Sequence, residues 1–212
     1  MKSIYCISGL GADERAFAAL HITGHKFVHL PWVLPDKKES IADYAKRMSE
    51  KITDENPILM GLSFGGMMCI EIAKLIAVEK VIIISSIKSR AELPTWMRTA
   101  GKIKLNKLLP LRPFKILEPY QNKRLGVKTK EEKHMVRHFR KNTPQIYTNW
   151  AINQILNWKN DWQPEKIFHI HGDSDKLFPI DKVKPNHVVK GGTHFMIIHK
   201  SEEVSRFINE VI

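Results

Sequence analysis

Short apolar runs alternate with amphipathic stretches along most of this chain. Six short runs have strand length, at positions 4–8, 27–30, 57–60, 81–85, 167–171 and 187–190, and the run at 81–85 is nearly all β-branched. The stretches between them carry apolar residues at helical spacing. Strands that alternate with helices are typical of a parallel sheet with helices on both faces. We therefore predict a doubly wound α/β fold with about six strands.

Capping residues mark where several helices begin. Asp13 precedes a short helix, Ser40 precedes a longer one with Asp43 in the capping-box position, and Ser201 precedes a final helix that continues to residue 212. An apolar helix is predicted at 64–77.

Residues 88–150 have a different pattern, which predicts helices and turns without strands. Thr129 and Glu132 form a capping box that opens a helix to about Lys141, and Thr143-Pro144 starts another with proline at its first position. We predict a core domain of residues 1–87 and 151–212, into which 88–150 is inserted.

The positive charge follows the same division. The chain has a formal net charge of +12, and residues 88–141 contain 16 Lys/Arg and 4 Asp/Glu, whereas the other residues contain 18 of each sign. The excess therefore belongs to the inserted segment rather than to the whole protein. A solvated helical face explains it more simply than nucleic-acid binding, which we do not expect, although a basic surface also attracts anionic substrates.

Composition excludes several protein classes. With 43% hydrophobic residues in 212, the chain can build a full core and is not expected to be disordered. It has no apolar stretch near 18 residues, so no transmembrane helix is predicted. Cys6 and Cys69 lie in apolar runs and are interpreted as buried free thiols, which favours a reducing, cytoplasmic location.

One motif carries candidate chemistry. Gly61-Leu62-Ser63-Phe64-Gly65 follows the third predicted strand and opens a helix. A serine in such a tight strand-to-helix turn is held in a strained conformation with its hydroxyl outward, and flanking glycines remove side chains where strand and helix would collide. A glycine-rich turn without catalytic function is the simpler alternative.

A serine nucleophile needs a base that is oriented by a third group. His194 follows the last predicted strand, and Asp175 follows the strand before it, so both lie at carboxyl ends of strands, where open α/β sheets place their sites. Asp173 competes with Asp175 as the acid, but it is more typical of a turn. His169 and His171 share one strand face near this loop and are interpreted as structural.

Together, these motifs resemble those of α/β-hydrolase-fold enzymes over nearly the whole chain. The resemblance rests on the 61–66 turn, the loop from Gly172 through Asp175 to Pro179, and Gly192-Thr193-His194-Phe195, in this order. It implies that Ser63 is the nucleophile, His194 the base and Asp175 its partner. It also implies a helical cap at 88–150, a core without the leading antiparallel strands, and oxyanion-hole N–H groups from Phe64 and Leu10, although Ser8 stands where many members have histidine.

The implied activity is hydrolysis of a small carboxylic ester or thioester without a metal or organic cofactor, and the basic segment favours an anionic substrate. His134 and His138 are four residues apart, but no acidic residue lies between them, so a zinc site is not predicted. Two alternatives stay open. A lyase or a C–C bond hydrolase can use the same triad, and a non-catalytic module could bind anions through the basic cap.

Overall fold

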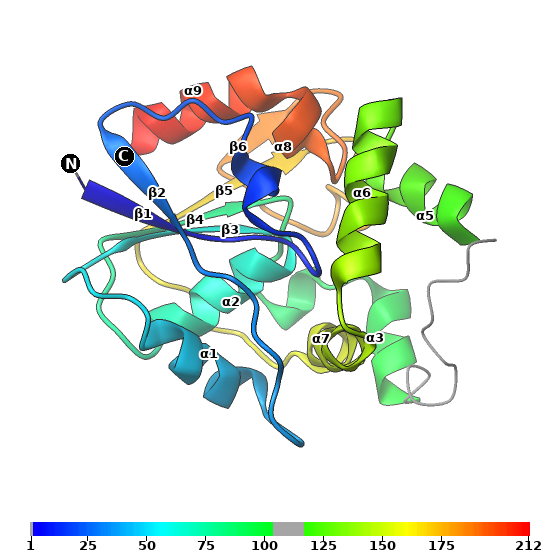
Figure 1. Cartoon of the computed structure of the whole chain (residues 1–212), viewed down its shortest axis with the longest axis horizontal. Coiled ribbons are helices and arrows are strands. Elements are labelled where there is room, and N and C mark those ends of the chain that lie inside the picture. Colours follow the sequence, from blue (N-terminus) through cyan, green and yellow to red (C-terminus); the bar gives the residue numbers. More distant parts are fainter. Residues whose placement is uncertain (1, 104–116) are drawn as a thin grey trace.

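A single twisted sheet organises the molecule (Figure 1). The computed structural model describes residues 2–103 and 117–212. In these residues the sheet has six strands in the order β2-β1-β3-β4-β5-β6, and every pairing is parallel. The strands are β1 (Lys2–Ile7), β2 (His25–His29), β3 (Ile58–Leu62), β4 (Lys80–Ile84), β5 (Ile167–Gly172) and β6 (His187–Val189). The predicted doubly wound parallel sheet is therefore confirmed.

The two faces of the sheet bury separate apolar clusters, because successive strand residues point to opposite faces. Tyr5 and Ile7 of β1 belong to the cluster beneath α1 (Ile41–Ser49) and α2 (Phe64–Ala73). Ile4 and Cys6 belong to the opposite cluster, beside the 3-10 turn η1 (Glu14–Phe17), α8 (Met196–His199) and α9 (Ser201–Val211). Figure 1 shows α1 and α2 on one side of the sheet and α9 on the other.

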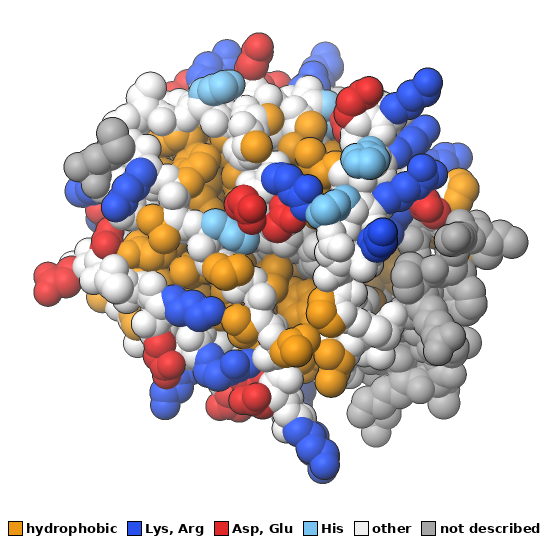
Figure 2. Space-filling model, in the orientation of Figure 1, with side chains coloured by type: hydrophobic (Ala, Val, Ile, Leu, Met, Phe, Trp, Pro, Cys, Tyr) orange, Lys and Arg blue, Asp and Glu red, His pale blue; other side chains and the backbone are white. Residues whose placement is uncertain are grey.

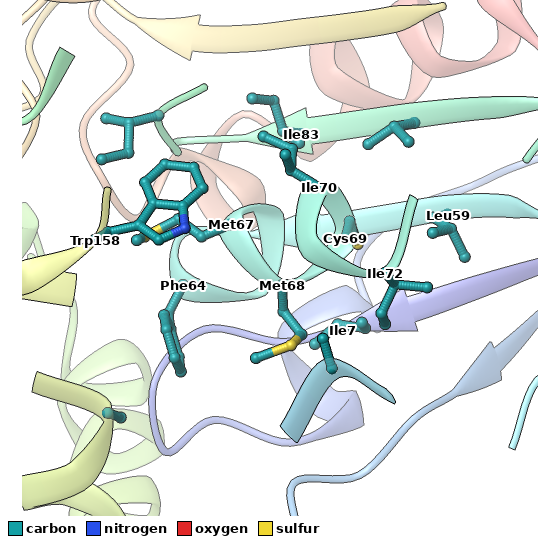
Figure 3. Packing of buried hydrophobic residues seen from close by; sticks show 14 of the residues in the cluster. Ile7, Leu59, Phe64, Met67, Met68, Cys69, Ile70, Ile72, Ile83 and Trp158 are labelled. Carbon is teal, nitrogen blue, oxygen red and sulfur yellow. The ribbon is translucent and has the colours of Figure 1, made fainter. Parts of the chain in front are cut away.

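Helix α2 is buried on almost every side, which explains why its sequence is apolar except for Glu71. Figure 3 shows Met67, Met68 and Cys69 packed among strand residues, with Trp158 against the same helix. The indole Nε1 of Trp158 donates to Glu71 Oε1 at 2.7 Å, so the one carboxylate of this helix has a buried partner.

The inserted helices come between β4 and β5 in the sequence. In space they lie beside the carboxyl ends of the strands (Figure 1). The described elements are η2 (Arg90–Glu92), α3 (Thr95–Lys102), α5 (Glu118–Leu125), α6 (Lys130–Asn142) and α7 (Gln145–Asn157). They form a helical cap. Helix α7 continues beyond residue 150, so the predicted domain boundary falls inside a helix, and the division at 88–150 stays a prediction.

The capping predictions have mixed outcomes. The side chains of Asp13, Ser40 and Thr129 accept N-terminal hydrogen bonds as expected, and Thr129 forms a full capping box with Glu132. The prediction for Ser201 is wrong, because Lys200 is the N-cap there and no side chain caps the helix. Helix α2 ends at Ala73 rather than residue 77, and Pro144 is the N-cap of α7 rather than its first residue. No helix in the described ranges is long and apolar enough to cross a membrane.

Candidate active site

Ser63 occupies the turn between β3 and α2 in a strained backbone conformation, with φ 53° and ψ −117°. Glycines on both sides make this turn possible. A Cβ on Gly61 would collide with the Gly65 backbone, and a Cβ on Gly65 would collide with the carbonyl of Ile7 in β1. The backbone strain and the close packing are the features expected where a serine hydroxyl is presented at the top of a sheet.

Three predicted side chains come together at this edge of the sheet. His194 Nε2 lies 2.9 Å from Ser63 Oγ, and His194 Nδ1 lies 2.7 Å from Asp175 Oδ2. The side chains of His194 and Asp175 are buried. Burial raises the pKa of Asp175, but attraction to His194 and the hydrogen bond between them outweigh it, and the pKa lies below its usual value. Asp175 is therefore an ionised acceptor that can orient the imidazole.

The acid loop distinguishes the two aspartates. Asp175 Oδ1 accepts the backbone N–H groups of Leu177 at 2.7 Å and Phe178 at 3.0 Å, which leaves Oδ2 facing His194. Asp173 is exposed, and its Oδ1 instead accepts the Gly191 N–H at 2.8 Å. Asp175 therefore contacts the histidine, whereas Asp173 ties the acid loop to the histidine loop.

A pair of buried histidines lies behind Asp175. His171 Nε2 is 2.8 Å from the Phe178 carbonyl and 3.4 Å from Asp175 Oδ2, so Nε2 carries the proton and donates. His171 Nδ1 is then free to accept from His169 Nε2, at 3.0 Å. Burial lowers the pKa of both histidines, although Asp175 opposes this effect at His171. Their i, i+2 spacing on one strand was the sequence signal, but their contact with the acid loop was not predicted.

Comparison with known proteins identifies the fold. No family model and no curated protein sequence matches the chain. Solved structures match it over nearly its full length. MenH from S. aureus has a TM-score of 0.74 at 16% identity, covering 99% of this chain and 92% of that one. An esterase from Exiguobacterium antarcticum has a TM-score of 0.73 at 11% identity, and the match covers 99% of this chain and 91% of the esterase. The N-acyl homoserine lactonase AidH, complexed with N-butanoyl homoserine, has 0.71 at 16% identity, with coverage of 99% and 88%.

The chain has the α/β-hydrolase fold. At these identities the likeness concerns the fold alone, so the chemistry depends on the residues of this chain.

In this α/β-hydrolase fold, the loop after β1 lies beside the serine. A Cβ placed on Gly9 would be 3.6 Å from Ser63 Cβ. Trp32 Nε1 donates to the Gly9 carbonyl at 3.1 Å, and Thr143 Oγ1 of the cap donates to the Gly11 carbonyl at 3.0 Å. Leu10, between these two glycines, is therefore held next to Ser63, and Phe64 follows Ser63 directly as the first residue of α2.

The cap also contacts the two loops that carry Asp175 and His194. The Leu125 carbonyl at the end of α5 accepts the Phe195 N–H at 3.0 Å. Arg124 Nη2 donates to the Lys176 carbonyl at 2.6 Å. Gly126, in the left-handed region with φ 77°, packs against Thr193 so closely that a Cβ there would collide with it. The end of α5 therefore braces the positions of His194 and Asp175.

Aromatic side chains from core and cap form one wall next to Ser63. The Trp32 and Phe64 rings stack with centroids 5.1 Å apart, and Tyr44 and Trp150 are 4.3 Å apart. Tyr147 of α7 contacts Trp32 with a centroid distance of 5.5 Å. Burial raises the pKa of Tyr44 to about 12, so its hydroxyl stays protonated and donates to the Val33 carbonyl at 2.8 Å. Trp32 and Tyr147 also line a hollow of about 220 Å³ beside the β1 loop.

The described residues contain no cluster of side chains that could form a metal site. Within residues 2–103 and 117–212, no three His, Cys, Asp or Glu side chains are grouped to hold an ion. On the cap, His138 Nε2 lies 2.5 Å from Asn142 Nδ2, so this ring nitrogen already has a side-chain partner. Cys6 and Cys69 are both free and buried, and burial raises the pKa of each thiol.

Proposed function

We propose that this protein is a serine hydrolase that cleaves a carboxylic ester or thioester through an acyl-enzyme. The observation that carries the proposal is the continuous contact from Ser63 Oγ through His194 to the ionised Asp175, built on a strained turn. The esterase and lactonase among the structural neighbours support the same class of chemistry. The substrate is a small molecule, and the charge of the cap favours an anionic one.

In the proposed mechanism, Ser63 Oγ attacks the carbonyl carbon while His194 Nε2 takes the hydroxyl proton. Asp175 holds the proton on Nδ1 and stabilises the imidazolium that results. The N–H groups of Phe64 and Leu10 receive the oxyanion. His194 then protonates the leaving alcohol or thiol, and in the second half it activates a water that releases the acid and restores the serine.

The test is covalent labelling with a serine-directed fluorophosphonate. We expect stoichiometric labelling of the wild type, none of Ser63→Ala, and strongly slowed labelling of His194→Gln. Ser85→Ala is a matched control, because Ser85 also has positive φ, 47°, directly after a strand, but it is fully buried, whereas Ser63 is half-buried. Equal labelling of wild type and Ser63→Ala would contradict the proposal.

Product analysis separates the remaining chemistries. Ester or thioester hydrolysis releases an acid and an alcohol or thiol and incorporates one oxygen from ¹⁸O-water into the acid. A C–C bond hydrolase also incorporates this oxygen but releases no alcohol or thiol, and a lyase consumes no water. A non-catalytic anion-binding module would give neither labelling nor turnover. The cytoplasmic location stays a prediction that rests on the two free thiols.

A further inference from the structure

A groove of about 870 Å³ lies between the cap and the loops that carry Asp175 and His194. Residues of α5 and α6 and of the turn between them form one wall. Ser174, Lys176 and Thr193 contribute to the other wall. Because Ser174 and Lys176 flank Asp175, and Thr193 precedes His194, a molecule in the groove would touch the loops of both groups.

The charge of this groove is strongly one-sided. Its lining includes five cations, and one carboxylate, Glu118, accompanies them. Arg137 Nε donates to Glu118 Oε1 at 2.6 Å, so this carboxylate is already neutralised. The other four cations are Lys123, Lys128, Lys133 and Lys176. In the part of the chain that the structure describes, no carboxylate forms an ion pair with any of these four.

Figure 2 shows that Lys and Arg side chains (blue) gather over α6. On the visible surface of the core domain, they are mixed with Asp and Glu side chains (red). All four of these lysines are exposed. A concave surface of one sign focuses its field and raises the local concentration of counter-ions. Four uncompensated ammonium groups therefore favour a ligand with several closely spaced negative charges over one with a single carboxylate.

We propose that this groove binds the di- or polyphosphate group of a small molecule. Lysine is a common point-charge partner of phosphate. The volume lies within the range of pockets for drug-sized ligands, about 300–1,000 Å³, and the groove is a hollow at a cap–core junction rather than a flat or extended basic face. These features favour a small ligand over a membrane surface or a nucleic acid. The phosphates belong either to the tail of the hydrolysed ester or thioester or to a separate effector.

The binding test uses the full-length Ser63→Ala protein and inorganic pyrophosphate, measured by calorimetry in 150 mM KCl. It does not depend on the proposed hydrolase function, because no turnover is needed. We expect saturable binding, and at least a tenfold weaker affinity for the double variant Lys123→Glu/Lys133→Glu.

The matched control is Lys130→Glu/Lys141→Glu, which changes the net charge equally with two exposed residues of α6 that do not line the groove. The Debye length is about 8 Å at this salt concentration, so charges outside the groove are largely screened. We expect less than a threefold change for this control. Absence of saturable binding, or equal weakening by both double variants, would overturn the proposal. Tighter binding of anionic vesicles or oligonucleotides through Lys123 and Lys133 would also overturn it.

A second measurement separates the two sources of phosphate and rests on the proposed function. With the active wild type, pyrophosphate should raise KM for a phosphate-bearing thioester and leave a neutral ester unaffected if the groove holds a substrate tail. A change in kcat for the neutral ester indicates an effector instead. If neither substrate turns over, the hydrolase proposal fails while the calorimetric result stands by itself.

Discussion

Replacing Gly126 by alanine tests whether the cap positions His194, the proposed general base. Gly126 ends α5 with φ 77°, and a Cβ built there would lie 2.5 Å from Thr193 Cγ2 and closer still to Thr193 Cβ and Oγ1. Ordinary van der Waals contact for a Cβ begins at about 3.4 Å. The substitution therefore requires a relative movement of about 1 Å between α5 and the histidine loop, an overpacking that typically costs about 1–3 kcal/mol of stability.

This movement would change the geometry of the proposed triad. Thr193 precedes His194, and the next residue, Phe195, donates its N–H to the Leu125 carbonyl at 3.0 Å. The loop cannot shift freely without changing the 2.9 Å contact between His194 Nε2 and Ser63 Oγ. A misplacement of about 1 Å can reduce turnover roughly 100-fold. We expect Gly126→Ala to lower kcat by about 10- to 100-fold, measured with the best ester from a substrate panel.

Alanine substitutions at two other glycines serve as controls, because they introduce backbone strain without a steric collision. Gly24 and Gly191 have φ values of 72° and 68°, and a Cβ on either would meet nothing within 4 Å. Alanine at these positions adds the left-handed strain, about 1–2 kcal/mol, without the collision. Gly191 is the stricter control, since it lies three residues before His194. Both variants should melt earlier and keep their turnover. Full activity of Gly126→Ala, or an equal loss in Gly191→Ala, would refute the positioning role of α5.

Two further predictions concern the supports of the site. Ser86 Oγ donates to the Ser63 carbonyl at 2.6 Å. We expect Ser86→Ala to lower the free energy of unfolding in urea by about 1 kcal/mol and to lower kcat less than tenfold. An unchanged midpoint of urea unfolding would contradict this expectation. Burial, followed by repulsion from His171 and Lys88, holds the pKa of His169 well below its usual value. Below about pH 6.5 the imidazole of His169 is therefore protonated in the unfolded chain but stays neutral in the folded chain. The free energy of unfolding then decreases as pH falls, by up to about 1.4 kcal/mol per pH unit. Thermal melts of His169→Asn from pH 8 to 5 should fall less steeply than those of the wild type, and parallel curves would count against the assignment.

The predictable features were those that short stretches of sequence encode. Strand alternation gave the parallel sheet, and the glycines around Ser63 indicated the turn, because both depend on local geometry. Helix ends were less predictable. Helix α2 ends at Ala73, although apolar residues continue, and Lys200 takes the N-cap position that Ser201 was expected to fill. Local signals at these ends do not decide the boundary, because tertiary packing competes with them.

The contacts that support the proposed triad could not be predicted, because they depend on tertiary structure or on the path of a loop. Arg124 reaches the Lys176 carbonyl across 52 positions. The spacing of His169 and His171 predicted a shared strand face near the acid loop, whereas the contact of His171 with Asp175 depends on how that loop folds back through Phe178. A sequence pattern identifies the types of side chain that can catalyse, but the groups that orient them belong to the tertiary structure.

The backbone segment that carries each of Ser63, His194 and Asp175 is held by bonds that do not involve the other two residues. The Ser63 N–H donates to the Ile84 carbonyl at 2.9 Å, and the Ser63 carbonyl accepts from the Gly66 N–H at 2.9 Å as well as from Ser86. Backbone N–H groups of its own loop hold Asp175, and α5 braces the loop of His194. A strained residue persists only when its surroundings over-determine it. The site is therefore preorganised, and removing the Ser63 hydroxyl should leave the geometry of His194 and Asp175 intact. For that reason Ser63→Ala can report ligand binding separately from catalysis.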